Sequence, residues 1–115
     1  KINNMVAYYI ARILWHPDPT LYISTHEIGG GLFIQHGFST VIDAESIGEN
    51  CWINQQVTIG YSGDKHPTIG NNCRIHCGAK VLGGVTMHDG SVAGANAVIV
   101  GGVPAKIIKY RTGEK

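Results

Sequence analysis

Apolar side chains recur at every sixth position through the middle of this chain, with one longer step between Ile59 and Ile69. This spacing fits neither the period of about 3.6 residues of an α-helix nor the two-residue period of an ordinary β-strand. It predicts instead short strands that meet at corners, so that each recurring side chain points into one shared axial core. The recurring residues are Val41, Ile47, Ile53, Ile59, Ile69, Ile75, Val81, Met87, Ala93 and Ile99.

Small residues and corner residues recur with the same six-residue period. A small side chain stands four residues after most core positions, as at Cys51, Cys73 and Ala79, and leaves room for close packing. Glycine and asparagine suit corners that need a positive φ angle. The corner candidates are Gly48, Asn50, Gly60, Gly70, Asn72, Gly90 and Gly94. Three such hexads complete one turn of a parallel β-helix, so the predicted fold class is all-β.

Composition limits the number of domains and the kinds of partner. A chain of 115 residues holds one core, and because it begins with Lys1 we expect an upstream part to be missing. A formal net charge of +1, with charged residues at 15%, provides no basic field for nucleic acid. No apolar run approaches the roughly 20 residues that span a bilayer, and no signal-peptide pattern is present. We therefore expect a soluble protein that binds neither nucleic acid nor membrane.

The three cysteines are expected to be reduced. Cys51 and Cys73 fall on inward positions of the repeat, and an odd number of thiols leaves one unpaired, which favours buried thiols in a reducing cytoplasm. Cys73, His76 and Cys77 are close in sequence, but their spacing matches no zinc pattern. We therefore expect core thiols and no metal.

Four segments of the repeat resemble the left-handed β-helix domain of bacterial hexapeptide-repeat acetyltransferases, and most closely that of the serine O-acetyltransferases. They are residues 47–52, 64–67, 78–83 and 102–106, and the resemblance extends over residues 2–110. It implies a left-handed coil, whereas parallel crossovers are otherwise right-handed. It also implies acetyl-CoA as co-substrate and a homotrimer, or a dimer of trimers, with three active sites at the subunit interfaces.

An amphipathic helix is predicted before the repeat, from Asn3 to Trp15, and Pro17 and Pro19 end it. One interpretation is a lid over the open end of the β-helix, where strand edges would otherwise be exposed. The other, drawn from the family, is the last helix of an N-terminal helical domain that packs trimers together. We therefore divide the chain into a helix and linker, residues 1–20, and a β-helix acetyltransferase domain with a C-terminal tail, residues 21–115.

The first interruption of the repeat places a histidine at a corner. Before the main repeat, apolar residues also stand six positions apart, at Tyr22, Ile28 and Ile34. The step from Ile34 to Val41 is one residue too long, which predicts a bulged corner that presents His36. In the serine acetyltransferases this histidine is the general base, and the aspartate before it binds the serine ammonium. Gln35 takes the aspartate's place and keeps an acceptor oxygen without the charge. An ordinary exposed turn histidine is the alternative.

A catalytic histidine is usually oriented by a further group. The aspartate that orients it in the family aligns near Leu21, which has no hydrogen-bonding side chain. Glu27, Asp43 or a backbone carbonyl must therefore substitute if His36 is to be oriented.

The second interruption is a step of ten residues instead of six, between Ile59 and Ile69. A loop that leaves a rigid solenoid is where such a scaffold carries function, because its strands are committed to the core. In the family this loop places a histidine in the active site and an arginine near the acceptor's carboxylate, and His66 and Lys65 match these positions. Lysine keeps the positive charge without the two-pronged hydrogen bonding of arginine. A solvated charged turn is the alternative.

The resemblance alone nominates the residues that bind the cofactor. In the family the pantetheine arm of coenzyme A follows the groove between subunits, and basic residues meet its phosphates. The candidates are Gly60, Gly78, Ala79 and Ala97 for the arm, with Lys106 and Lys109 for the phosphates. Relatives usually carry a longer loop between the counterparts of Val100 and Gly101. Either this protein dispenses with that loop, or the sequence skips it.

The resemblance implies acetyl transfer from acetyl-CoA to a hydroxyl, first of all that of L-serine in cysteine biosynthesis, by a cytoplasmic enzyme. O-acetylation of a sugar in polysaccharide biosynthesis is the alternative acceptor. A non-catalytic hexapeptide scaffold is the alternative of another class, and histidines at both interruptions of the repeat argue against it. A hexapeptide carbonic anhydrase would need zinc on His36, His66 and either His76 or His88, but their spacing does not match that family.

Overall fold

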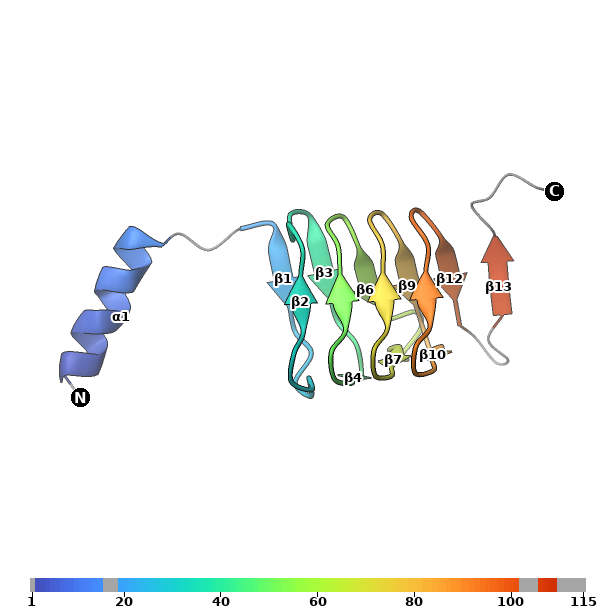
Figure 1. Ribbon diagram of the computed structural model, residues 1–115, viewed down its shortest axis with the longest axis horizontal. Coiled ribbons are helices and arrows are strands. Elements are labelled where there is room, and N and C mark those ends of the chain that lie inside the picture. Colours follow the sequence, from blue (N-terminus) through green and yellow to red (C-terminus); the bar gives the residue numbers. More distant parts are fainter. Residues whose placement is uncertain (1, 16–18, 102–105, 110–115) are drawn as a thin grey trace.

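The computed structural model describes residues 2–15, 19–101 and 106–109, with the backbone alone at residues 2–3 and 106–109. Within these ranges one helix, α1 (Ile2–Leu14), precedes a series of short strands. Figure 1 shows α1 at one end and the strands stacked into a regular solenoid beside it. No helix in the described ranges is long and apolar enough to cross a membrane.

The strands form three sheets, one for each side of the solenoid. The six-stranded sheet contains, in order, β1 (Leu21–Ile23), β3 (Thr40–Ile42), β6 (Thr58–Gly60), β9 (Lys80–Leu82), β12 (Val98–Val100) and β13 (Lys106–Lys109). The three-stranded sheet contains β4 (Ser46–Ile47), β7 (Thr68–Ile69) and β10 (Thr86–Met87). The four-stranded sheet contains β2 (Phe33–Ile34), β5 (Trp52–Ile53), β8 (Arg74–Ile75) and β11 (Val92–Ala93). Pairing between these strands is parallel throughout, except that β13 runs antiparallel to β12. The predicted parallel β-helix is confirmed.

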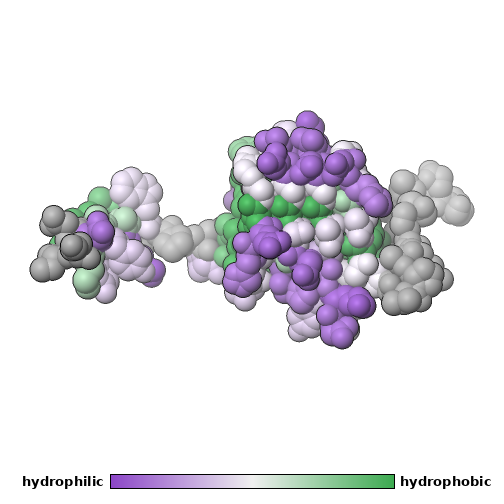
Figure 2. Space-filling view, turned by 90° about the horizontal axis from the view of Figure 1, so that it is seen from below, coloured by the Kyte–Doolittle hydropathy of each residue, from purple (hydrophilic) through white to green (hydrophobic). Residues whose placement is uncertain are grey.

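Figure 2 looks onto the side of the solenoid that the three-stranded sheet forms. Hydrophilic residues gather along both edges of this face, and an apolar band runs between them.

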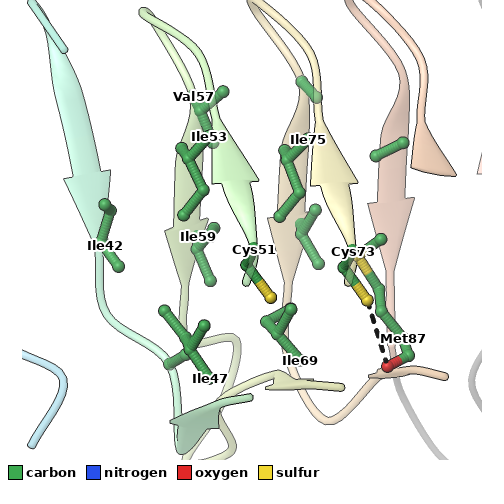
Figure 3. Close-up of a cluster of buried hydrophobic side chains, with 14 residues drawn as sticks. Ile42, Ile47, Cys51, Ile53, Val57, Ile59, Ile69, Cys73, Ile75 and Met87 are labelled. Carbon is green, nitrogen blue, oxygen red and sulfur yellow. Dashed lines mark hydrogen bonds between the residues drawn. The ribbon is translucent and has the colours of Figure 1, made fainter. Parts of the chain in front are cut away.

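The core is a column of side chains that point inward from all three sheets (Figure 3). The register stacks like on like, because Ile47 pairs with Ile69 and Ile53 with Ile75. The buried residues at the recurring positions are Ile47, Ile53, Ile59, Ile69, Ile75, Val81, Met87 and Ala93. Each fully buried aliphatic side chain of this size contributes roughly 1.5–3 kcal/mol to folding. The hexapeptide core is thereby confirmed over these positions.

Val41 and Tyr22, predicted as core positions in the first coils, are not buried: Ile42 takes the place of Val41, and Ile23, beside Tyr22, is 42% exposed. Ile42 is fully buried, whereas Val41 is half-buried. Tyr22 pairs with Val41 and is exposed, and Ile23 is the partner of Ile42. Adjacent residues of a strand point to opposite faces, so only one of two neighbouring apolar residues can enter the core. The step from Ile34 to the next core residue is therefore one residue longer than predicted.

Corner glycines serve two different purposes. Asn50, Asn72 and Gly90 have positive φ angles, as predicted. Gly48, Gly60, Gly70 and Gly94 do not, which corrects the prediction for these four. A Cβ atom on Gly48 would stand 2.7 Å from the carbonyl carbon of Gly70, and one on Gly70 would stand 2.9 Å from the backbone nitrogen of Asp89. These two positions need glycine because the next coil passes too close for a side chain.

Helix α1 stands apart from the solenoid (Figure 1). Its described side chains, from Asn4 onward, are all exposed. The apolar face consists of Met5, Val6, Tyr9, Ile10 and Ile13. The interpretation of this helix as a lid on the solenoid is therefore wrong, and its place in a larger helical domain stays a prediction.

Candidate active site

The two predicted catalytic histidines lie at opposite ends of the strands of the six-stranded sheet. His36 is in the turn from β2 to β3, and His66 is in the loop from β6 to β7. We define the His36 corner as residues 35–39, 54–57, 76–79 and 94–97, and the His66 corner as residues 24–27, 43–45, 61–67 and 83–85. The strands between these corners have three residues each, which separates the corners by about 10 Å. A single chain therefore does not bring His36 and His66 together.

The backbone presents His36 to solvent. The φ angle is 72° at both His36 and Gly37, and the N–H of Gly37 donates a hydrogen bond of 2.9 Å to the carbonyl of Gln35. A residue with a side chain in this left-handed conformation costs on the order of 1–3 kcal/mol, and such costs concentrate at functional sites. The exposed His36 side chain has no hydrogen-bond partner within the described ranges. The geometry agrees with the predicted bulged corner, and the catalytic role stays a prediction.

Gln35 belongs to a polar network that crosses three coils at the His36 corner. Its Oε1 accepts hydrogen bonds from Nε1 of Trp52, at 3.0 Å, and from Nδ2 of Asn54, at 2.9 Å. Oδ1 of Asn54 lies 3.3 Å from Nδ1 of His76. The sequence singled out Gln35 but missed its two partners, Trp52 and Asn54, and His76 beyond them, because these residues meet only when successive coils stack.

At the opposite corner His66 is paired with a carboxylate. Oδ1 of Asp43 lies 3.4 Å from Nε2 of His66, and the side chains are 24% and 34% exposed. The ring of Tyr61 lies 5.5 Å from the imidazole, measured between centroids. A carboxylate beside one ring nitrogen holds the proton there and leaves the other, Nδ1, as the acceptor. Asp43 was predicted as a candidate partner of His36, and within one chain it contacts His66 instead.

Asp43 and His66 line a pocket of about 430 Å³. The other lining residues are Ser24, His26, Glu27, Ala44 and Glu45. Within one chain Glu27 therefore also lies away from His36, and its role as a carboxylate partner stays a prediction. The Ser24 hydroxyl is buried without a hydrogen-bond partner among the described residues. A concave site with several polar groups of this kind can hold a small polar molecule.

The loop that carries His66 is folded back on itself. The N–H groups of Ser62 and Lys65 each donate to the other residue's carbonyl, at 3.0 and 3.3 Å, and Gly63 at the tip has a φ of 67°. Pro67 is fully buried and anchors the return to β7. The Lys65 side chain is exposed and lies against Gly84 of the next coil. Lys65 thus stands beside the His66 corner, and its role in binding an acceptor stays a prediction.

Three of the predicted cofactor residues share the His36 corner. Gly78, Ala79 and Ala97 lie there in successive coils, whereas Gly60 ends β6 at the opposite edge. Ala79 is fully buried, so a ligand could reach its backbone but not its side chain. Lys106 and Lys109 are on β13, and their side chains lie outside the described residues.

The thiols and histidines of the described ranges do not converge on an ion site. Among the described residues, no group of three or more His, Cys, Asp or Glu side chains is arranged to hold a metal. Cys51 and Cys73 are free and buried, as predicted, and Cys77 is half-buried.

The sequence is similar to those of serine acetyltransferases. It is 38% identical over 106 residues to the enzyme of Helicobacter pylori (strain ATCC 700392 / 26695), covering 88% of this chain and 58% of the relative. It is 44% identical over 110 residues to the enzyme of Staphylococcus xylosus, covering 91% of this chain and 48% of the relative. The chain thus spans about half the length of the curated relatives it matches. No family model matches it.

The fold is also that of a solved serine acetyltransferase in complex with CoA. The two structures agree with a TM-score of 0.64 at 30% sequence identity, over 76% of this chain and 42% of the other. Fold and repeat together define a left-handed β-helix protein built from hexapeptide repeats, which confirms the expected class. Within that class, the chain is similar to the serine acetyltransferases over about half of their length.

Proposed function

We propose that the protein transfers the acetyl group of acetyl-CoA to a hydroxyl of a small acceptor, with L-serine as the first candidate. Its similarity to serine acetyltransferases, one of them solved with CoA, supports this reaction. The observation that carries the proposal is the pair of histidine sites, His36 on a strained exposed turn and His66 against Asp43 in a pocket. Packing of the coil does not require a histidine held by a carboxylate in a pocket. Three free thiols fit a reducing compartment, so we place the reaction in the cytoplasm.

The proposed active unit is a homotrimer whose sites lie between neighbouring subunits. The outward face of the six-stranded sheet carries several apolar residues, namely Tyr22, Val41, Leu82, Val98 and Val100. The corresponding row of the three-stranded sheet is polar, namely Ser46, Thr68 and Thr86. Three copies that turn the apolar sheet toward a common axis would place the His36 corner of each against the His66 corner of the next.

This arrangement also unites the predicted cofactor residues. Gly78, Ala79 and Ala97 of one subunit and Gly60 of the next would border the same groove, where small side chains leave room for the pantetheine arm of CoA. Lys106 and Lys109 would supply positive charge for its phosphates.

In the proposed reaction His36 takes the proton of the acceptor hydroxyl as that oxygen attacks the thioester carbon. The bond between the carbonyl carbon and sulfur breaks, and the proton passes to the departing CoA sulfur. General base catalysis of this kind contributes roughly 10²–10⁴ in rate. His66, held by Asp43, would bind the acceptor through Nδ1, and Lys65 would attract its carboxylate.

The reaction is tested by following free thiol release from acetyl-CoA with L-serine, homoserine and a panel of nucleotide sugars. We expect turnover that His36→Ala lowers by roughly 10²–10⁴. Preference for a sugar by more than about tenfold in kcat/KM would replace serine by a sugar hydroxyl within the same reaction. No thiol release with any acceptor, together with no calorimetric binding of acetyl-CoA, would show a non-catalytic scaffold.

A further inference from the structure

The direction of every hydrogen bond in the network around Gln35 is set by Trp52. An indole Nε1–H can only donate, so the atom of Gln35 that it meets at 3.0 Å must be the oxygen. The same oxygen meets Asn54 at 2.9 Å, so Asn54 must turn its NH₂ group toward Gln35. Its Oδ1 is then left to accept from Nδ1–H of His76, at 3.3 Å. The network is consistent in this one direction.

Gln35 therefore offers donors and not an acceptor to anything bound beside it. A carbonyl oxygen has two lone pairs, and both are occupied by Trp52 and Asn54. The Nε2 group has no hydrogen-bond partner among the described residues. Gln35 immediately precedes the exposed His36 in the chain, so this NH₂ group belongs to the residue that adjoins the proposed base. Within one chain the oxygen of Gln35, which we expected to accept from an ammonium group, is already occupied by Trp52 and Asn54.

The charged side chains near Gln35 also favour an oxygen as its ligand. The guanidinium of Arg74 lies 4.9 Å from the centroid of the Trp52 ring. Nζ of Lys80 donates to the carbonyls of Gln56 and Gly78, at 3.1 and 2.9 Å. The segments that form the His36 corner contain no Asp or Glu. Arg74 and Lys80 lie beside these segments, so the charges that a single chain places around Gln35 favour an oxygen with partial or full negative charge.

We infer that Gln35 sets the acceptor specificity of the proposed acetyl transfer by donating a hydrogen bond from Nε2 to an oxygen of the acceptor. The inference rests on the proposed function and narrows its substrate class. The acceptor is a hydroxyl compound with a second oxygen, as hydroxyl or carboxylate, beside the reacting group. An ammonium at that place gains nothing from Gln35.

The test compares L-serine with L-glycerate, which has a hydroxyl in place of the ammonium group and is otherwise the same. For the wild-type protein we expect kcat/KM for the two acceptors to agree within about tenfold. Gln35→Glu should raise the ratio of L-serine to L-glycerate by roughly ten- to a hundredfold, because a carboxylate oxygen replaces the NH₂ group and accepts from the ammonium. Trp52 and Asn54 can still donate to the other carboxylate oxygen, so the variant should fold, which its thermal melting checks.

Gln55→Glu is the matched control. It adds the same charge to the same corner, but the Gln55 side chain takes no part in the network, so the ratio should stay as in the wild type. A wild-type preference for L-serine of more than about tenfold, or an equal response of both variants, would overturn the inference while leaving acetyl transfer in place. Absence of transfer to every acceptor would overturn the proposed function and this inference with it.

Discussion

Oδ1 of Asp43 lies 3.4 Å from Nε2 of His66, although Asp43 follows β3 and His66 belongs to the loop one coil further on. The pair exists only because the coils stack in register, with Ile42 beside Ile59 at the end of these strands. The carboxylate of Asp43 restrains the imidazole of His66, whereas the exposed imidazole of His36 has no partner among the described residues.

Asp43→Asn should weaken catalysis by loosening His66. The amide is the same size but carries no charge to attract the imidazole, so we expect the KM for the acceptor to rise roughly tenfold, with a smaller fall in kcat. Steady-state kinetics with varied acceptor measure this split. Glu45→Gln removes a carboxylate from the same pocket without touching His66 and should leave both constants nearly unchanged. Equal effects of the two variants would mean that only the pocket's total charge matters.

His36→Gly should separate stability from activity. Glycine adopts a φ of 72° without a Cβ penalty, so the variant should gain about 1 kcal/mol in unfolding free energy while losing turnover by roughly 10²–10⁴. Gln56→Gly relieves a φ of 60° at the same corner and should stabilise without loss of activity. Urea unfolding and thiol-release assays measure the two quantities. A His36→Gly variant that is both less stable and inactive would indicate a structural histidine.

Mixed trimers test whether one site needs two subunits. His36→Ala and His66→Ala homotrimers should each be nearly inactive, yet unfolding and refolding them together should restore activity at about a quarter of the sites, where an intact His36 meets an intact His66. Thiol release after co-refolding provides the measurement, and each variant refolded alone is the control. No recovery would place a complete site within one chain.

The thiol of Cys51 predicts how stability depends on alkaline pH. Burial raises the pKa of the Cys51 thiol above its ordinary value of 9.0, so the unfolded chain releases this proton first as pH rises. The stabilisation is fully present below pH 9.0 and is lost as pH rises through the raised pKa. Urea unfolding at about pH 8 and pH 10 should show a larger loss for the wild type than for Cys51→Ala. Cys77→Ala, at a half-buried position, should behave like the wild type.

The sequence predicted the solenoid and most of its core, because an apolar period of six residues has few other physical explanations. It did not predict which of Val41 and Ile42 points inward, since both are apolar and a repeat does not show where a corner absorbs an extra residue. Gly48 was predicted to be glycine because of a turn, but the position needs glycine because the backbone of the next coil lies too close for a side chain.

Contacts between coils account for what was missed at the site. Two contacts show this: that of Asp43 with His66 and that of Gln35 with Trp52. Each depends on the number of residues in one coil, and this number cannot be read from the sequence because the corners differ in length. The positions of both histidines at interruptions could be read from the sequence, but not the groups that hold them.

The loop of residues 61–67 leaves the coil without disturbing the ladder around it. Thr68 still pairs with Ser46 on one side and Thr86 on the other, and Gly60 still pairs with Leu82. Because each coil is fastened to its neighbours by its own strands, the fold sets no length for the chain between two strands at this corner. A segment of different length and chemistry grafted at residues 61–67 would therefore leave the strands of the solenoid as they are, which makes this corner the natural place to change what the surface presents.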